Sequence, residues 1–302
     1  MHVFVTGGSG LTGPAIVAEL IAAGHTVTGL ARSADAAARL RKLGADTLTG
    51  SLEDLDRLRA GAKAADGVIH MAFGGSFADP EDLVRRDRTA IETLGQALAG
   101  SGKPFVSTSG TLVMPGGRVS DEQDAPDPAS IAWFRIPGEQ ACLTMAGQQV
   151  RSSVVRLAPT VHGPGDHGFI PMLIAAARKH GVSAYIGDGA NRWPAVHRLD
   201  AAVLFRLALE QAPAGSALNG AAENVTLRSV AEQVARSLGL PAVSLTPEQA
   251  AGHFGDPFMA GVFAADAPVS SVRTQKLLGW SPTHPTLLED IEAGDYCAPQ
   301  AA

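Results

Sequence analysis

The sequence predicts an α/β fold in which a doubly wound parallel sheet is followed by a smaller, mostly helical lobe. Strands and helices alternate through the first half of the chain, and a glycine-rich turn joins the first strand to the first helix. Beyond about Gly163 the alternation gives way to helices separated by Gly- and Pro-rich loops. Because alternation gives a parallel sheet with helices on both faces, we expect residues 1–158 to form the first domain. Residues 159–302 are expected to form the lobe, with some segments returning to that domain.

The individual elements follow from this alternation. Strands are expected at His2–Thr6, Thr26–Leu30, Asp46–Thr49, Gly67–His70, Pro104–Ser107 and Ser153–Leu157. Helices between them are expected at Pro14–Ala23, Ala34–Lys42, Glu53–Ala60, Pro80–Ala99 and Ile131–Ala146. The lobe is expected to hold helices at Pro171–Lys179, Asp200–Gln211, Leu227–Leu238 and Glu248–Phe254. In such a sheet the ligand crevice lies at the carboxyl ends of the strands.

The turn Thr6–Gly13 has the spacing of a dinucleotide-binding loop. Gly7 allows a tight turn, Gly10 allows close approach of the dinucleotide, and Gly13 lets the helix pack near the sheet. The strand, turn, helix and second strand follow one another in the required order. Backbone N–H groups at the helix start can hold a pyrophosphate, so the segment predicts a Rossmann-type dinucleotide site.

The end of the second strand indicates which dinucleotide binds. NAD sites usually place an acidic residue here for the ribose 2′-hydroxyl, whereas an arginine accommodates a 2′-phosphate. This chain has Arg32 and Ser33, with no acidic residue before Asp35. A guanidinium grips a phosphate with two parallel hydrogen bonds, so NADP is favoured over NAD. A merely solvent-exposed arginine is the alternative.

Composition limits the partners that the chain can have. With 302 residues and a net charge of −6, it offers no basic surface for nucleic acid. No apolar run is long enough to span a membrane, and no leader pattern is evident at the start, so a cytoplasmic location is expected. Neither the two distant cysteines, Cys142 and Cys297, nor the histidines show a metal-ligand spacing. No metal site is therefore expected.

Several segments in chain order carry a family resemblance. They are the spacing Gly7, Gly10 and Gly13, then Asp66–Ala72, Phe105–Gly110, Val155–Gly165, Gly187–Gly189 with Val196–Asp200, and Leu277–Pro282. Together they resemble the extended short-chain dehydrogenase/reductase superfamily, which includes the nucleotide-sugar epimerases and dehydratases. The resemblance implies a Rossmann fold, a nicotinamide cofactor and a small-molecule substrate. Relatives are often dimers, so a homodimer is a possible partner state.

The chain departs from that family at the catalytic helix. The family carries a Tyr-x-x-x-Lys pair there, and the matching positions hold Arg135 and Glu139. The resemblance is therefore to atypical members that have lost the pair. One interpretation is that Glu139 accepts hydrogen bonds from the ribose while Arg135 stabilises negative charge on a substrate oxygen. The other is an ordinary ion pair, four residues apart on a solvated helix face.

The candidate catalytic residues are Ser109, Arg135 and His162. The resemblance implies that Ser109 binds a substrate oxygen, although this hydroxyl and those of Thr108 and Thr111 can instead cap the strand end. His162 replaces a family tyrosine, and histidine side chains can act as acid or base at neutral pH, but a structural loop histidine is the alternative. The predicted cofactor-binding residues are Gly7, Gly10, Leu11, Thr12, Gly13, Arg32, Ser33, Ser51, Leu52, Met71, Ala72, Phe73, Ser107, Glu139, Pro159 and Val161.

Three functions are compatible with these residues. The first is an NADP(H)-dependent oxidoreductase that moves a hydride between nicotinamide and a small carbonyl or alcohol. The second is an epimerase or dehydratase of nucleotide sugars with a retained NAD, against which Arg32 argues. The third is a catalytically silent NADP-binding sensor or interaction protein. Substrate choice is expected to depend on loops 74–79 and 115–128 and on the lobe.

Overall fold

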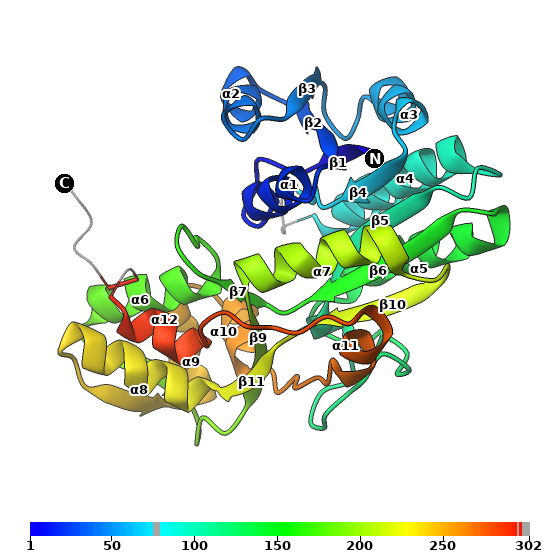
Figure 1. The fold of residues 1–302 in the computed structure, drawn as a ribbon. Coiled ribbons are helices and arrows are strands. Elements are labelled where there is room, and N and C mark those ends of the chain that lie inside the picture. Colours follow the sequence, from blue (N-terminus) through cyan, green and yellow to red (C-terminus); the bar gives the residue numbers. More distant parts are fainter. Residues whose placement is uncertain (75–78, 295, 298–302) are drawn as a thin grey trace.

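The computed structural model describes residues 1–74, 79–294 and 296–297, and it contains a parallel sheet of seven strands (Figure 1). The strand order is β10-β6-β5-β4-β1-β2-β3. The strands are β1 (His2–Thr6), β2 (Thr26–Ala31), β3 (Asp46–Thr49), β4 (Gly67–His70), β5 (Pro104–Gly110), β6 (Arg151–Leu157) and β10 (Ser216–Gly220). Every neighbouring pair is parallel. The predicted doubly wound α/β fold is confirmed.

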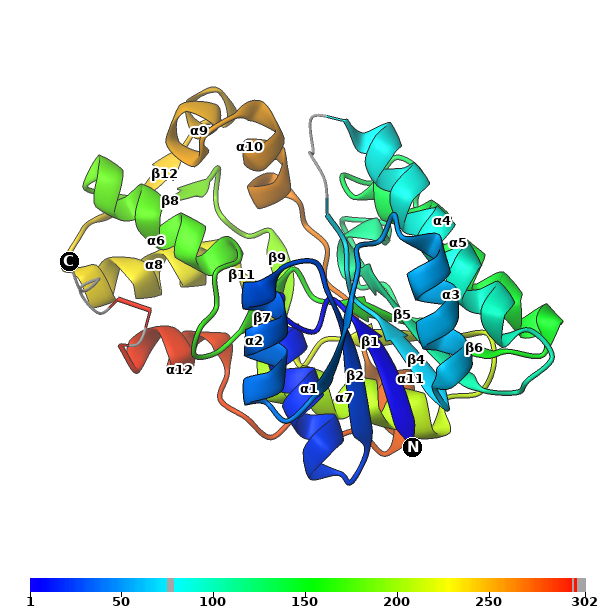
Figure 2. The same ribbon diagram turned by 90° about the horizontal axis from the view of Figure 1, so that it is seen from above.

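Helices cover both faces of this sheet (Figures 1 and 2). They are α1 (Gly13–Ala22), α2 (Ala34–Lys42), α3 (Leu55–Ala64), α4 (Pro80–Leu98), α5 (Ile136–Thr144) and α7 (Arg198–Gln211). Side chains alternate along β1, so Val3 and Val5 face the core under α1 and α7, whereas Phe4 faces the core under α3, α4 and α5. This double burial explains the continuous apolar runs of the strands.

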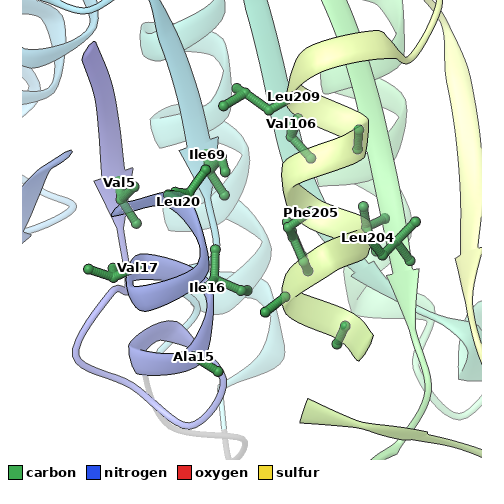
Figure 3. Close-up of a cluster of buried hydrophobic side chains, with 14 of the residues drawn as sticks. Val5, Ala15, Ile16, Val17, Leu20, Ile69, Val106, Leu204, Phe205 and Leu209 are labelled. Atoms are coloured by element: carbon green, nitrogen blue, oxygen red, sulfur yellow. The ribbon is translucent and has the colours of Figure 1, made fainter. Parts of the chain in front are cut away.

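Helix α7 and strand β10 come from the later half of the chain but pack on this sheet. The α7 side chains Leu204, Phe205 and Leu209 are fully buried and share one core with Ile69 and Val106 (Figure 3). Strand β10 extends the sheet beyond β6. Strand β10 was not predicted, because its sequence Ser-Ala-Leu-Asn-Gly is short and partly polar.

The remaining elements form a lobe beside the sheet (Figure 2). Its helices are α6 (Phe169–His180), α8 (Leu227–Leu238), α9 (Pro247–Phe254), α10 (Pro257–Ala264) and α12 (Leu287–Glu292), while α11 (Val272–Leu278) contacts β10 and α7. It also holds two small sheets that were not predicted: β11-β9-β7 and β12-β8. Their strands are β7 (Thr160–His162), β8 (Ser183–Ile186), β9 (Arg192–His197), β11 (Glu223–Thr226) and β12 (Ala242–Leu245). Trp193 is 1% exposed and stacks on Phe263 in the core of the lobe.

The predicted helix 131–146 was wrong in its bounds. The α-helical part is Ile136–Thr144, and a 3₁₀ turn at Trp133–Arg135 precedes it. Pro137 explains the difference, because proline lacks an N–H and clashes with a helix carbonyl four residues earlier. Proline is tolerated only in the first turn, so the helix begins just before it. Among the residues that the structure describes, no helix is long and apolar enough to cross a membrane.

Candidate functional site

A cleft with a volume of about 660 Å³ runs along the carboxyl ends of the sheet strands. This is the place where doubly wound sheets bind ligands. The cleft is lined by Gly7, Ser9, Gly10, Leu11, Thr12, Gly13, Leu30, Arg32, Ser33, Ala36, Arg39, Gly50, Ser51, Leu52, Glu53, Met71, Ala72, Phe73, Gly74, Arg86, Thr108 and Leu157. The glycine turn forms its floor between β1 and α1, and the ends of β2, β4 and β5 form its walls.

The glycines of the turn differ in what they permit. A Cβ atom on Gly13 would lie 2.3 Å from the Gly7 carbonyl oxygen, so only glycine lets α1 start this close to the turn. A Cβ on Gly10 would meet only that same oxygen, at 3.2 Å. Gly10 therefore lies against the open cleft rather than against protein. Helix α1 has neither a side-chain N-cap nor an acidic residue in its first turn, and such a helix start attracts anions.

Two arginines line the cleft near the end of β2. Arg32 follows β2 directly, and Arg39 lies on α2 one turn beyond Ala36, which also lines the cleft. Ser33 caps α2 by accepting a hydrogen bond from the Ala36 N–H at 3.2 Å. Within residues 1–74, 79–294 and 296–297, neither guanidinium has a side-chain hydrogen bond or ion pair in the structure. Both cations are therefore available to a ligand in the cleft.

The end of β4 leads from the cleft into a buried polar network. His70 Nδ1 lies 2.8 Å from the Thr6 hydroxyl, and His70 Nε2 lies 3.3 Å from Asp87 Oδ1 on α4. The Thr6 hydroxyl also accepts a hydrogen bond from the Ala72 N–H at 3.4 Å. All three polar side chains are at most 3% exposed. This network fixes the backbone from which Met71, Ala72 and Phe73 enter the cleft.

Arg135 lies at the boundary between the cleft and this network. Its guanidinium carbon sits 3.8 Å above the centre of the Phe73 ring, and its Nη2 donates to the Thr108 carbonyl. Its Nη1 lies 3.7 Å from Asp87 Oδ2 but makes no hydrogen bond within the described part of the chain. Burial lowers the pKa of Arg135, opposed by the nearby Asp87 carboxylate. Two residues of the cleft wall thus touch this cation, Phe73 through its ring and Thr108 through its backbone carbonyl.

Glu139 is not the partner of Arg135. Glu139 Oε1 accepts hydrogen bonds from Arg156 Nε at 3.0 Å and Arg156 Nη2 at 2.5 Å. Glu139 and Arg156 are each 3% exposed. The alternative of a solvated Arg135–Glu139 pair was therefore wrong. It relied on the spacing of four residues along a helix, but Arg135 lies in the 3₁₀ turn, and each residue has a charged partner on another element.

Ser109 lies beside this buried pair. It is paired with Arg156 in the β5–β6 register and is 3% exposed. Its hydroxyl and those of Ser107 and Thr111 are buried without a hydrogen-bond partner among the described residues. Successive side chains of a strand point to opposite faces, so residues 107 and 109 share one face of β5. Residue 111 follows just beyond the end of that strand. A buried hydroxyl without a partner costs free energy, and Ser109 lies one residue from Thr108, which lines the cleft, although Ser109 itself does not.

The structure places most of the predicted cofactor-binding residues in the cleft. Those that line it are Gly7, Gly10, Leu11, Thr12, Gly13, Arg32, Ser33, Ser51, Leu52, Met71, Ala72 and Phe73. Those that do not line it are Ser107, Glu139, Pro159 and Val161. Loop 115–128 is described, whereas residues 75–78 of the predicted specificity loop 74–79 lie outside the described residues.

His162 does not lie at the mouth of the cleft, where a proton donor was expected. It is 1% exposed, and its Nδ1 lies 2.5 Å from Asp290 Oδ2 on α12. The reason is that β7 pairs with β9, so the His162 ring meets His197 edge to face at 5.4 Å. This environment is typical of a structural histidine at the junction of the lobe.

His197, Asp200 and His284 meet at the same junction, with possible ligand atoms within 4.8 Å of one another. The His197 and His284 rings are stacked at 7°, so their nitrogen lone pairs run parallel and do not converge on one ion. Both oxygens of Asp200 already accept backbone hydrogen bonds, from Thr283 at 3.0 Å and from His284 at 3.1 Å. These contacts favour a structural tie between α7 and residues 283–284.

The family is identified by sequence comparison. The model of the NAD dependent epimerase/dehydratase family matches residues 3–220, which span the entire seven-stranded sheet. The chain belongs to this epimerase/dehydratase family. An uncharacterized protein of Schizosaccharomyces pombe is 44% identical over 98% of this chain and 100% of its own length.

Proteins with named activities are also similar to this chain. A 4-hydroxy-2-methyl-3-oxo-4-farnesyl-3,4-dihydroquinoline-1-oxide ketoreductase of Stigmatella aurantiaca is 28% identical over 85% of this chain and 80% of its own. Among solved structures, a dTDP-glucose 4,6-dehydratase from Streptomyces venezuelae, with NAD and TYD bound, superposes with a TM-score of 0.78. It is 19% identical, and 98% of this chain and 96% of that chain are covered. That likeness shows the shared fold.

Some cleft residues of this epimerase/dehydratase family member were missed from the sequence. Arg39 was detectable, because it lies three residues beyond Ala36 and so on the same face of α2. Arg86, on α4, reaches the cleft while paired with Glu53 at 2.6 Å, and nothing local in the sequence indicates that pairing. Thr108, which precedes the predicted Ser109, lines the cleft from the opposite side of β5.

Proposed function

We propose that this protein is an NADP(H)-dependent oxidoreductase acting on a small carbonyl or alcohol. The observation that carries the proposal is the pair of unpartnered arginines, Arg32 and Arg39, lining a cleft whose floor is a dinucleotide-type glycine turn. The 2′-phosphate distinguishes NADP from NAD, and arginine forks bind phosphate well. A cation at the end of β2 would leave the ribose hydroxyls of NAD without their usual carboxylate acceptor.

The residues present fit such a cofactor along the whole cleft. The N–H groups at the start of α1, together with the open face of Gly10, would hold the pyrophosphate. Arg32, Ser33 and Arg39 would hold the 2′-phosphate. Met71, Ala72 and Phe73 would lie along the part that leads towards β5. When bound, the nicotinamide supplies or accepts the hydride.

The groups near the end of β5 would act on the substrate oxygen. The buried Ser109 hydroxyl has no partner within the described chain, so it can donate a hydrogen bond to that oxygen. Arg135, held by Thr108, Phe73 and Asp87, would stabilise the negative charge that develops there. Arginine cannot release a proton at neutral pH, so the proton of a reduction would come from solvent.

The comparisons support this reaction class over a silent binding protein. The Stigmatella relative is by name a ketoreductase. No observation in the site favours nucleotide-sugar epimerisation.

The cofactor assignment is tested by titration calorimetry with NADP⁺ and NAD⁺. The wild type should bind NADP⁺ at least about tenfold more tightly, the effect of one or two charge-assisted hydrogen bonds. Arg32→Asp should reverse the preference, and Arg39→Glu should weaken NADP⁺ more than NAD⁺. Arg41→Glu is the matched control, since Arg41 is also on α2 but binds Thr47 at 2.9 Å outside the cleft. Equal affinities in the wild type would refute the proposal.

A further inference from the structure

Tyr296 lies against loop 163–168, which is distant from it in sequence. The Tyr296 hydroxyl donates a hydrogen bond to Asp166 Oδ2 at 2.8 Å and accepts one from the Gly163 N–H at 3.0 Å. Asp166 Oδ1 in turn accepts from the Gly168 N–H at 2.6 Å. One hydroxyl and one carboxylate therefore connect both ends of loop 163–168.

Helix α12 makes a second contact with the same region. Asp290 on α12 meets His162, the last residue of β7 and the one before the loop, at 2.5 Å. Figure 2 shows α12 among the helices of the lobe, where it packs against α8. We refer to α12 together with Tyr296 as the C-terminal strap. It holds the loop and the strand that leads into it.

The far side of the loop touches the glycine turn. Arg198, the first residue of α7, donates to the Pro164 carbonyl of the loop and, at 3.4 Å, to the Leu11 carbonyl of the turn. A Cβ atom built on Gly168 would lie 3.5 Å from the Leu11 side chain, which is van der Waals distance. Leu11 itself lines the cleft. A continuous set of contacts therefore joins Tyr296 to the turn.

The environment of Tyr296 suits a structural donor rather than an acid. Burial and the Asp166 carboxylate raise the pKa of Tyr296, so its hydroxyl keeps its proton. Burial also raises the pKa of Asp166, against the effect of its hydrogen bonds to Gly168 and Tyr296. Nothing in these contacts points to proton transfer. Their effect is to hold a loop in place.

We propose that Tyr296 is a positioning residue for dinucleotide binding. Its hydroxyl holds loop 163–168 against Arg198 and Leu11, and this contact keeps the peptide groups of the glycine turn in the arrangement that receives the pyrophosphate. The inference rests on the proposed dinucleotide site. It adds a requirement for dinucleotide binding that lies outside the glycine turn, namely the Tyr296 hydroxyl.

The test is Tyr296→Phe in the full chain, with Tyr185→Phe as the matched control. Tyr185, the only other tyrosine in the sequence, lies on β8 with Arg228 near its ring, and among the described residues its hydroxyl makes no hydrogen bond to the loop. The dissociation constant and dissociation rate of NADPH are measured by its fluorescence, and the thermal midpoint is measured without nucleotide. Tyr296→Phe should release NADPH about tenfold faster, with the nucleotide-free midpoint lowered by only about 2–4 °C through the loss of two part-buried hydrogen bonds. Tyr185→Phe should bind as the wild type does.

Asp166→Asn adds a second variant: its single amide oxygen can still accept from the tyrosine hydroxyl, but the amide NH2 then faces the Gly168 N–H, so that hydrogen bond and the charge are lost. Its NADPH affinity should lie between those of the wild type and Tyr296→Phe. Unchanged NADPH release in Tyr296→Phe would overturn the inference. So would a lowered nucleotide-free midpoint that accounted for the whole loss of affinity. A wild type that binds neither NADPH nor NADH would instead overturn the proposed function together with this inference.

Discussion

At the scale of single residues, the glycines of the turn differ in their roles: some are needed for binding alone and others for folding as well. Gly10→Val should abolish NADPH binding, because the side chain would project into the cleft where the pyrophosphate is expected. Its unfolding free energy should change by less than about 1 kcal/mol, since a Cβ there meets only the Gly7 carbonyl, at 3.2 Å. Fluorescence titration and urea unfolding measure the two quantities.

Gly13→Ala is the contrasting variant for this prediction. Its Cβ would overlap the Gly7 carbonyl oxygen at 2.3 Å, and a forced backbone shift of this kind costs about 1–3 kcal/mol. Gly13→Ala should therefore lose stability as well as binding. If folded Gly10→Val still bound NADPH, the glycine turn would not be the pyrophosphate site.

Arg135 makes the second prediction at this scale. Arg135→Lys keeps the charge but loses the planar guanidinium group that contacts Thr108, Phe73 and Asp87. Turnover of a carbonyl substrate, followed by the absorbance of reduced nicotinamide, should fall by about 10²–10³, the effect of removing one donor to a developing oxyanion. NADPH affinity should stay within about 0.5 kcal/mol of the wild type, as for a residue that contacts substrate alone. Equal losses of turnover and cofactor affinity would assign Arg135 to the cofactor instead.

Sequence alone was most successful where the chemistry is local. The turn Thr6–Gly13 and the following Arg32 lie within one strand-helix-strand unit, so their positions in the cleft followed from spacing. Partners distant in sequence were not predictable in this way. Glu139 binds Arg156, 17 residues away on β6, and His162 binds Asp290, 128 residues away on α12. No local periodicity carries that information.

At the scale of elements, the Glu139–Arg156 pair joins α5 to β6 inside the protein. Both side chains are 3% exposed, and removing one member of such a pair leaves the other charge buried without compensation. Glu139→Ala should therefore lower the unfolding free energy by about 3–5 kcal/mol, measured by urea unfolding. The double variant Glu139→Ala with Arg156→Met should lose less than the sum of the two single losses. Additive losses would show that the pair contributes no coupling.

The start of helix α5 was mispredicted because the sequence signal that marks it was present but weak. Pro137 marks the first turn of α5, yet the apolar and charged residues before it suggested an earlier start. The strands β7, β9 and β11 went unpredicted because each pairs with a segment far away in sequence, and short strands carry little pattern of their own. Helices α1, α2, α4, α8 and α9, by contrast, were predicted to within one residue at both ends.

At the scale of the whole molecule, the sheet domain cannot be separated from the later chain at residue 158. The fully buried Leu204, Phe205 and Leu209 of α7 cover the face that Ile69 and Val106 present, and the whole of β10 pairs with residues 153–157 of β6. Each large apolar side chain that is buried contributes about 1.5–3 kcal/mol. Losing three of them costs about 4.5–9 kcal/mol, which is comparable with the usual net stability of about 5–15 kcal/mol.

A fragment of residues 1–158 should therefore lack a cooperative thermal transition and should bind a hydrophobic dye, although it contains nearly the whole lining of the cleft. Near-ultraviolet circular dichroism during heating measures the transition, with the full chain as the control. The fragment should not bind NADPH, because Arg198 and loop 163–168, which support the glycine turn, are also lost. A cooperative transition with retained NADPH affinity would show that α7 and β10 are dispensable. The glycine turn would then be a self-sufficient unit, rather than one that depends on contacts contributed by the second half of the chain.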